Sequence, residues 1–566
     1  MWTSTLELSP RRVILTRLLG SVWPDAYFSS FAPLQVQNLP RQPLPAANWV
    51  RVRNRLAGIC GSDLHLIYGD GDFRIAPAAI ANERFSYPGH EVVGEVIEVG
   101  DEVQRLQVGD RVVLQHSPNC VTAGVEPICH SCAIGNFSLC ERADLPGPKP
   151  FGGGWSEEML VHEQQLFPVP PDMSDEQAAL LEPSSVAVHA ALRHLPQPDE
   201  HVLIIGAGTI GLLTLQAIHA LSPQTRISVQ ARHAFQVEQA MRMGATQILY
   251  PQDNYTGVQR ATGAHLYTGM MGNSMLLGGY DVIYDTVGSK RTLSNALRWT
   301  RAGGTVVLVG VNLHLMRIDL TPIWFQEVNL VGTYGNGMET WPPNTNERRS
   351  TFAITSDLII QRQLFPEKLI THRFALNNYR QALTTATGKA QSRAIKVLFD
   401  YSLLPASVVP NVRAAAQQRQ PLPGRVPSPS TPYVTWQPVP SPSPMVIPAP
   451  PAETPDFIPT PLTTPEEVPA PSSIEAPPPS EETPPSIAPA ESIIPAESQE
   501  TQQANQVQDD ENSPATVVVR KPKYTRQKSK VQEPNEIVQA NNQLQEEMPD
   551  EPGAHGEAAP DATTGK

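Results

Sequence analysis

Residues 201–218, HVLIIGAGTIGLLTLQAI, join an apolar strand pattern, a glycine-rich turn and an apolar helix pattern in one continuous segment. Similar segments alternate after it: RISVQ, YDVIYDTVG and GTVVLVGV have the β-branched composition of strands, and AFQVEQAMRMGA that of a helix. Strands that alternate with helices indicate a parallel sheet with helices packed on it. From about Ser174 onward the sequence therefore predicts an α/β domain with a doubly wound parallel sheet.

The turn in this segment has glycines at GxGxxG spacing. The spacing alone is weak evidence, and the alternative is a glycine-rich turn without a ligand. Its place between an apolar strand and an apolar helix is the context in which such glycines let a pyrophosphate approach the helix N-terminus. We therefore expect a dinucleotide site. Its expected contact residues are Gly206, Gly208, Thr209, Ile210, Gly211 and, after a later strand, Val309.

The end of the second strand should distinguish NAD from NADP. NAD sites usually place an Asp or Glu about 20 residues past the glycines, where it holds the ribose diol. This chain has Ala231 there, preceded by Gln230 and followed by Arg232 and His233. Because no carboxylate is available and two potential cations could face a 2′-phosphate, the pattern favours NADP over NAD. The alternative is that Arg232 points into solvent.

The region from about Leu34 to Leu166 has a different pattern. Short apolar runs such as HEVVGEVIEVG and DRVVLQH are broken by Gly, Pro and Asp. This pattern predicts a β-rich, barrel-like domain with long loops. After about Glu327 the β-like segments VNLVGTYG and AIKVLFD follow, and we expect them to complete this first domain.

One cysteine stands apart from the others. Cys60 lies alone in GICGSDLH, and His90 and Glu91 follow in YPGHEVVGEV. A catalytic zinc has about three protein ligands and one open position, and a thiolate, an imidazole and a carboxylate could supply those ligands. For an isolated Cys and His, a buried small side chain and a turn residue would be the better interpretation. The polar residues of GICGSDLH and the remaining cysteines favour the zinc site.

The other four cysteines form a cluster. Cys120, Cys129, Cys132 and Cys140 have eight, two and seven residues between successive members. The CxxC within it could be a redox pair, but four cysteines in a loop-like region suit a zinc-bound lobe better. Four thiolates leave no position for a substrate, so we expect a structural zinc. An odd number of cysteines with this spacing also argues for a reducing compartment rather than a disulfide framework.

With these residues in place, the chain resembles the zinc-containing medium-chain dehydrogenase/reductase family. GICGSDLH, GHEVVGEV, the four-cysteine lobe, LLEPSSVAVHA, GAGTIG and the final strands occur in the family order, over about residues 10–400. The resemblance implies a GroES-like catalytic domain at 1–172, completed by 327–400, and a Rossmann dinucleotide-binding domain at 173–326. The first two cysteines of the lobe are further apart here than is usual, and the loop VTAGVEPI could bulge out without moving the sulfurs.

The resemblance also assigns roles to residues. Cys60 and His90 are implied zinc ligands, and the third ligand is Glu91 or Glu182, the Glu of LLEPSS. Ser62 and His65 are similar to the residues that carry the substrate proton to solvent. Glu182 stands where alcohol dehydrogenases proper have a Cys, which moves the chain towards the polyol, sugar and threonine dehydrogenases.

The implied function is oxidation of a small alcohol, with two zinc ions per chain and NAD(P). The family's pattern also leads us to expect a homodimer or homotetramer. The alternative is a catalytically inactive dehydrogenase fold that acts as a scaffold through its tail. The intact zinc and glycine motifs argue against this alternative.

The chain beyond residue 400 differs in composition from the rest. Of 58 prolines, 33 lie there, with 21 acidic and 10 basic residues, so most of the net charge of −14 belongs to this tail. Such a stretch cannot bury enough apolar area to offset its ordering entropy. We therefore expect residues 401–566 to be a disordered, Pro-rich acidic tail that binds an unknown partner. Its basic run, Arg520 to Lys530, lies among acidic residues, which argues against nucleic-acid binding.

No targeting or membrane segment is evident. Arg11, Arg12 and Arg17 interrupt the first apolar stretch, which argues against a signal peptide. The longest apolar run, Val202 to Leu221, contains Gln216 and His219 and fits a strand, a turn and a buried helix better than a membrane span. We expect a soluble, cytoplasmic protein.

Overall fold

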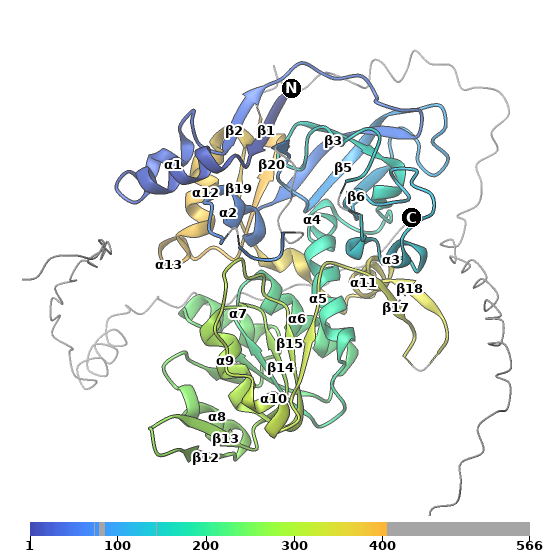
Figure 1. Cartoon of the computed structure of the whole chain (residues 1–566). Helices are drawn as coiled ribbons and strands as arrows, with labels where there is room; N and C mark the ends of the chain where they lie inside the picture. Colours follow the sequence, from blue (N-terminus) through green and yellow to red (C-terminus); the bar gives the residue numbers. More distant parts are fainter. Residues whose placement is uncertain (73, 78–84, 143, 344, 405–566) are drawn as a thin grey trace, which may run out of the picture. The chain divides into compact units, whose positions relative to one another are not determined.

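The computed structural model describes residues 1–404, except 73, 78–84, 143 and 344 (Figure 1). The predicted disordered tail lies outside the described residues, apart from its first four, so its disorder stays a prediction. Among the described helices, none has the length and hydropathy needed to cross a membrane. As predicted, Val202 to Leu221 forms a strand, a turn and a helix.

A seven-stranded, mainly antiparallel sheet forms the β-rich part of the fold. Its strand order is β19-β20-β3-β5-β6-β8, and β7 also pairs with β3. Only β19 and β20 run parallel to each other. The strands are β3 (Trp49–Gly58), β5 (Val92–Val99), β6 (Arg111–Leu114), β7 (Glu158–His162), β8 (Leu166–Pro168), β19 (Ile370–Phe374) and β20 (Lys396–Asp400).

A second sheet has six parallel strands in the order β11-β10-β9-β14-β15-β16. In chain order this is 3-2-1-4-5-6, the arrangement of doubly wound dinucleotide-binding folds, which confirms the predicted sheet. The strands are β9 (His201–Ile205), β10 (Arg226–Gln230), β11 (Gln247–Leu249), β14 (Tyr280–Asp285), β15 (Thr300–Leu308) and β16 (Asn329–Gly332).

The segment VNLVGTYG was expected to complete the first domain, and for it this prediction is wrong. Its strand, β16, pairs in parallel with β15 and is the last strand of the six-stranded sheet. A short apolar strand carries no local signal that tells which of two sheets it joins. The segment AIKVLFD, in contrast, forms β20, which pairs antiparallel with β3 of the seven-stranded sheet.

The remaining elements are short strands and helices. The smaller sheets contain β1 (Trp2–Glu7), β2 (Leu34–Asn38) and β4 (Phe85–Ser86), and the hairpins β12 (His265–Thr268) with β13 (Ser274–Leu277) and β17 (Met338–Thr340) with β18 (Arg348–Ser350). The helices are α1 (Pro10–Gly20), α2 (Gly61–Ile67), α3 (His130–Ala133), α4 (Asp175–Ala179), α5 (Leu181–Arg193), α6 (Thr209–Leu221), α7 (Ala234–Arg242), α8 (Asn254–Thr262), α9 (Lys290–Trp299), α10 (Thr321–Phe325), α11 (Thr351–Ile360), α12 (Tyr379–Thr387) and α13 (Lys389–Ser392).

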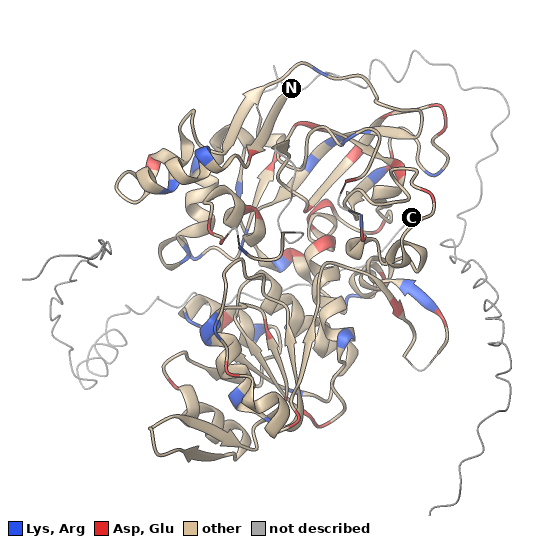
Figure 2. Ribbon diagram, viewed as in Figure 1, with Lys and Arg blue, Asp and Glu red and all other residues tan. Residues whose placement is uncertain are grey.

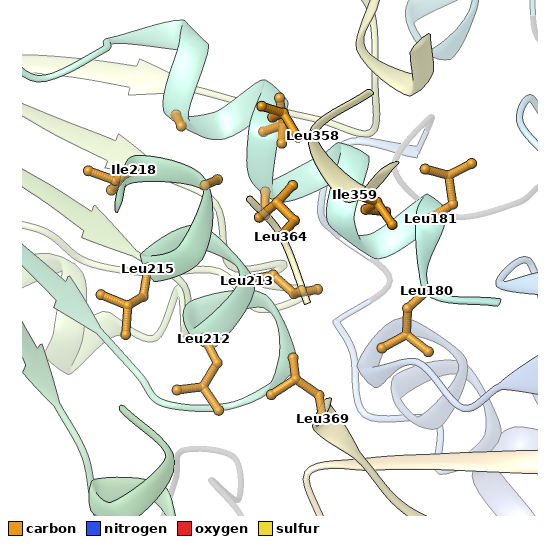
Figure 3. Packing of buried hydrophobic residues seen from close by; sticks show 14 of the residues in the cluster. Leu180, Leu181, Leu212, Leu213, Leu215, Ile218, Leu358, Ile359, Leu364 and Leu369 are labelled. Carbon is orange, nitrogen blue, oxygen red and sulfur yellow. The ribbon is translucent and has the colours of Figure 1, made fainter. Parts of the chain in front are cut away.

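The largest apolar core surrounds α6, the helix that follows the glycine turn. Leu212, Leu213 and Leu215 of this helix pack in one cluster with leucines of α5 and with α11 (Figure 3). Helix α6 is apolar on nearly every side because it is enclosed by other elements, as expected for a helix without a solvent-facing stripe. This packing holds the glycine turn rigidly at the end of β9.

Basic and acidic residues lie interspersed along the described chain in the view of Figure 2. On the seven-stranded sheet, Arg53 and Arg55 of β3 both pair with Glu95 of β5. Charges of opposite sign therefore offset each other locally in this sheet. The basic run Arg520 to Lys530 lies outside the described residues, so the expectation against nucleic-acid binding stays a prediction.

Candidate active site

Cys60 lies at the junction between the seven-stranded sheet and α2. It is the N-cap residue of α2, and its backbone N–H donates to Asp63 Oδ2 at 3.2 Å. This capping arrangement fixes the first turn of the helix. Ser62 and His65 lie three positions apart on the same helix, so both belong to one face. The SDLH part of the motif thus forms a short helix that starts beside the thiol.

Three of the expected zinc ligands come together. One ligand atom each from Cys60, His90 and Glu91 lies within 4.8 Å of the others. His90 and Glu91 directly precede β5, and Cys60 follows β3, which pairs with β5. A thiolate, an imidazole and a carboxylate at this spacing fit a zinc ion and leave room for a fourth ligand.

Asp63 contacts residues next to this set and orients them, a role that the sequence motif did not specify. Its buried carboxylate accepts the Gly89 N–H at 3.3 Å and lies 3.6 Å from His90 Nδ1. Carboxylates in this position orient ligating histidines. Burial disfavours the charged imidazolium, but the negative charges of Asp63 and Cys60 outweigh it and raise the pKa of His90 well above its ordinary value. The same field favours a bound cation.

Glu91 has a partner that no local motif indicates. The Lys396 ammonium, on β20, donates to Glu91 Oε2 and also to the Ile59 carbonyl at 3.2 Å. Both side chains of the ion pair are buried, and although burial lowers the pKa of Lys396, Glu91 raises it above its ordinary value. A Cβ on Gly58 would lie 1.9 Å from Glu91 Oε2, so only glycine leaves space for this carboxylate.

Glu182 lies in the first turn of α5 and interacts with the same set. Burial raises its pKa to about 7; the charge of His90 lowers it and that of Glu91 raises it. These electrostatic interactions place Glu182 beside the three-residue set, although it is not one of the three mutually close groups. Both carboxylates that the resemblance offered as third ligand are therefore near His90.

The four remaining cysteines are also brought together. Their sulfurs lie within 4.8 Å of one another, and none of the four forms a disulfide. The backbone N–H groups of Cys132 and Glu141 each donate to Cys129 Sγ at 3.5 Å, which lowers the pKa of this thiol to about 7 despite its burial. Burial instead raises the pKa of Cys120 and Cys132, and a bound cation would favour their thiolates, so the four sulfurs fit a closed tetrahedral zinc site. The longer loop after Cys120 folds back on the cluster through Val125 and Ile128.

The glycine turn has the geometry that a dinucleotide needs. Gly206 has φ +105°, a left-handed conformation, and a Cβ on Gly211 would lie 1.9 Å from the Gly206 carbonyl oxygen. Gly208 is the N-cap residue of α6, and among the described residues no heavy atom beyond its chain neighbours and the local helix backbone lies within 4 Å of the position its Cβ would take. The open side at Gly208, in front of the helix N-terminus, is where a pyrophosphate can approach the backbone.

The other expected nucleotide contacts lie around this turn. Thr209 and Ile210 begin α6, and Thr209 Oγ1 donates to the Ile395 carbonyl at 3.0 Å. Val309 directly follows β15 and donates its N–H to the Asp285 carbonyl at 3.0 Å. At the end of β10, Ala231 is buried and Arg232 is exposed. The structure therefore places these residues at the carboxyl ends of the parallel strands.

His65 has partners that sequence reasoning missed. Its Nδ1 lies 3.0 Å from Asp70 Oδ2, and the other oxygen, Asp70 Oδ1, lies 2.9 Å from His314 Nε2. His314 comes from the loop after β15, at the nucleotide-binding sheet. No spacing rule connects residues 65 and 314, so only the three-dimensional structure could reveal this chain of groups.

Comparison with known proteins agrees with this geometry. Residues 46–171 match the alcohol dehydrogenase GroES-like domain, and residues 209–348 match the zinc-binding dehydrogenase domain. A sorbitol dehydrogenase from Arabidopsis thaliana is 32% identical over 62% of this chain and 88% of its own length. An L-idonate 5-dehydrogenase from Vitis vinifera is 31% identical over 62% of this chain and 87% of its own length.

Solved structures show the same fold. An alcohol dehydrogenase from Escherichia coli CFT073, complexed with NADH, is 25% identical and has a TM-score of 0.52 over 65% of this chain and 96% of its own. A 2R,3R-butanediol dehydrogenase from Bacillus subtilis is 27% identical, with a TM-score of 0.50 over 65% and 96%.

A two-sheet fold with these motifs defines a zinc-dependent oxidoreductase that acts on CH–OH groups with a nicotinamide cofactor. The chain belongs to the zinc-containing medium-chain dehydrogenase/reductase family. Within it, the relatives include polyol, butanediol and L-threonine dehydrogenases, and the scaffold alternative is not favoured.

Proposed function

We propose that this dehydrogenase oxidises a hydroxyl of a polyol or related sugar alcohol, reversibly, with NADP in preference to NAD. The observation that carries the proposal is the close set of Cys60, His90 and Glu91. Glu182, in place of a cysteine, and the similarity to sorbitol and L-idonate dehydrogenases support a polyol rather than a simple alcohol.

The residues present fit two zinc ions per chain. Cys60 and His90 would hold the catalytic ion, with Glu91 or Glu182 as third ligand. The mutual proximity of the three-residue set supports Glu91, whereas the ion pair with Lys396 occupies one oxygen of Glu91 and leaves Glu182 as the competing ligand. Cys120, Cys129, Cys132 and Cys140 would hold the structural ion.

Catalysis needs a bound zinc ion, a bound nicotinamide cofactor and a path for the proton that leaves the substrate hydroxyl. When bound, zinc supplies a Lewis acid that lowers the pKa of the substrate hydroxyl, and the nicotinamide supplies the hydride acceptor. The chain's own task is proton movement: Ser62, near the start of α2, takes the hydroxyl proton. His65, three residues further on the same helix, passes it outward.

The preference for NADP rests on the end of β10. Buried Ala231 cannot hold a ribose diol, and exposed Arg232 lies next to it, where a guanidinium can pair with a 2′-phosphate. The N–H groups of Arg232 and His233 both donate to Gln236 Oε1 at 3.3 Å, which fixes the backbone of this turn.

The proposed organisation follows the sheets. The catalytic domain comprises 1–172 and is completed by β19 and β20, and the nucleotide domain begins at 173 and runs through β16.

We also propose a homodimer or homotetramer in the cytoplasm. Support for self-association comes from the edge strand β16, with exposed Trp324 and Phe325 on the preceding α10, since an edge strand offers unpaired backbone groups. Sedimentation analysis measures the oligomeric state.

A substrate panel tests the function. Sugars, polyols and amino alcohols are assayed with NAD and NADP by the absorbance of the reduced nicotinamide. We expect turnover with polyols and a higher kcat/KM with NADP, and loss of turnover after zinc removal. Absence of turnover with every alcohol by the zinc-loaded chain would contradict the proposal.

A further inference from the structure

The chain of groups His65, Asp70 and His314 connects α2 to the loop after β15. Asp70 lies three residues after the end of α2, and its two carboxylate oxygens are shared between the two histidines at 3.0 and 2.9 Å. A single carboxylate held by two imidazoles cannot turn without losing one of them. Its orientation towards His65 is therefore set from the far side by His314.

The loop that carries Asp70 is itself held on two sides. Asp72 N–H donates to the Leu313 carbonyl at 2.7 Å, and Arg17 of α1 donates to the Gly71 carbonyl at 3.4 Å. Gly69 has φ +59° and leaves space for Val13, also from α1. The charged groups around the carboxylate are thus Arg17, Asp72 and Arg74, and Asp72 and Arg74 pair with each other.

Asp70 is ionised at neutral pH. Partial burial by itself would raise the pKa of Asp70, but the hydrogen bonds from His314 and His65 lower it below its ordinary value. An ionised carboxylate accepts a proton-bearing nitrogen, so His65 Nδ1 carries the hydrogen and His65 Nε2 is left with its lone pair. The tautomer of His65 is consequently fixed, with the basic nitrogen on the other side of the ring from Asp70.

We propose that Asp70 and His314 are positioning residues for proton transfer through His65. Asp70 orients the imidazole and stabilises its charged form, and His314 holds Asp70. This inference rests on the proposed function, in which His65 passes the substrate proton outward. Ser62 takes the proton of the alcohol as its own hydroxyl proton passes to His65 Nε2, which gives the imidazolium, and water then takes a proton from that imidazolium, so charge and protons balance.

The sign of the effect follows from the charges. A carboxylate beside an imidazole favours the imidazolium and raises its pKa. Asp70→Asn removes that charge, so the acidic limb of the kcat/KM profile should move to lower pH. We expect kcat to fall about three- to tenfold, because a misoriented general base transfers protons less efficiently.

The test compares Asp70→Asn with Asp72→Asn in the full chain. Asp72 is a matched control because it lies in the same loop but hydrogen-bonds Arg74, and it interacts with His314 only through its charge. Asp72→Asn should leave both the pH profile and the NMR titration of His65 unchanged. His65 is followed in the full chain with 13C-labelled histidine, and His65→Gln identifies its signal. Asp70→Glu should restore part of the wild-type pH profile, and His314→Gln should change the profile in the same direction as Asp70→Asn but by less.

The outcomes distinguish the positioning role of Asp70 from the proposed dehydrogenase function. If the titration of His65 in Asp70→Asn coincides with that in Asp72→Asn, the positioning role is overturned whatever the activity. If the wild-type chain turns over no alcohol in the panel but the NMR signal of His65 still differs between Asp70→Asn and Asp72→Asn, the proposed function fails while the coupling of Asp70 to His65 stands. Equal melting temperatures of the loop variants and wild type ensure that the differences are local.

Discussion

Replacement of Lys396 by Met tests the buried ion pair that fixes Glu91. Lys396 and Glu91 are 2% and 1% exposed, so neither charge can turn to water when its partner is removed. Lys396→Met keeps the apolar stem but leaves the Glu91 carboxylate buried without its counter-charge. Breaking a buried pair in this way costs about 3–5 kcal/mol.

The expected change in melting temperature follows from the size of the folded body. With about 2.1 cal/mol/K of unfolding entropy per residue, roughly 400 residues that unfold together have about 0.8 kcal/mol/K, so Lys396→Met should lower Tm by roughly 4–6 °C. Differential scanning calorimetry at one scan rate, on zinc-loaded and zinc-free protein, measures it. The zinc-free comparison isolates the ion pair from any loss of metal.

Two further variants make the test specific. Lys389→Met is the matched control: Lys389 is only half-buried, and burial together with Lys396 lowers its pKa, so its removal should leave Tm nearly unchanged. Lys396→Met combined with Glu91→Gln should recover much of the loss, because no uncompensated charge remains. A Tm of Lys396→Met within a degree of that of Lys389→Met would refute the reasoning.

Further predictions concern the metals, the cofactor and the tail. Cys129→Ser should reduce zinc from about two equivalents to about one and lower Tm, because three thiolates leave the tetrahedral site incomplete; one zinc in the wild type, unaffected by this change, would contradict the structural site. His90→Ala or Cys60→Ala should abolish turnover but leave NADP affinity largely intact, since the glycine turn belongs to the other sheet; appreciable residual activity would show that the catalytic metal is misassigned. Ala231→Asp with Arg232→Leu should shift the kcat/KM ratio towards NAD by roughly tenfold, about 1.4 kcal/mol; a tenfold preference for NAD in the wild type would exclude the NADP assignment. Truncation after Leu404 keeps the buried Tyr401 and Leu404 and should change neither Tm nor turnover; loss of either would mean that residues 405–566 contribute to the folded body.

The nucleotide-binding half could be predicted from the sequence because its signals are local. The strand, turn and helix of residues 201–218 adjoin one another, and the GxGxxG spacing records two close approaches that exclude a side chain. The four cysteines are local in the same sense, since 21 residues contain all of them and short loops suffice to gather the sulfurs. Such patterns are visible in the sequence because the residues that interact are close to one another along the chain.

The groups that support the site could not be predicted, because their partners are distant in sequence. Lys396 is 305 residues from Glu91, and His314 is 244 residues from Asp70. Neither pair has a periodic pattern or a motif, and each depends on how strands from different parts of the chain are ordered in a sheet. The misassignment of β16 has the same origin, since pairing with β15 is a property of the sheet and not of the segment.

The charges of the site explain why it contains both Lys396 and a set of metal-ligating residues. The site gathers Cys60, Asp63, Glu91 and Glu182, and Lys396 is the single buried cation among the groups that shift the pKa of Glu182, apart from His90. Four acidic groups against one lysine leave an excess of negative charge in a partly buried place, and the raised pKa of Glu182 reflects both this burial and the repulsion from Glu91. A divalent cation offsets most of that excess, and deprotonation of its ligands accompanies its binding. Lys396 on β20 therefore supplies one positive charge to this acidic set, and a divalent metal would supply two more.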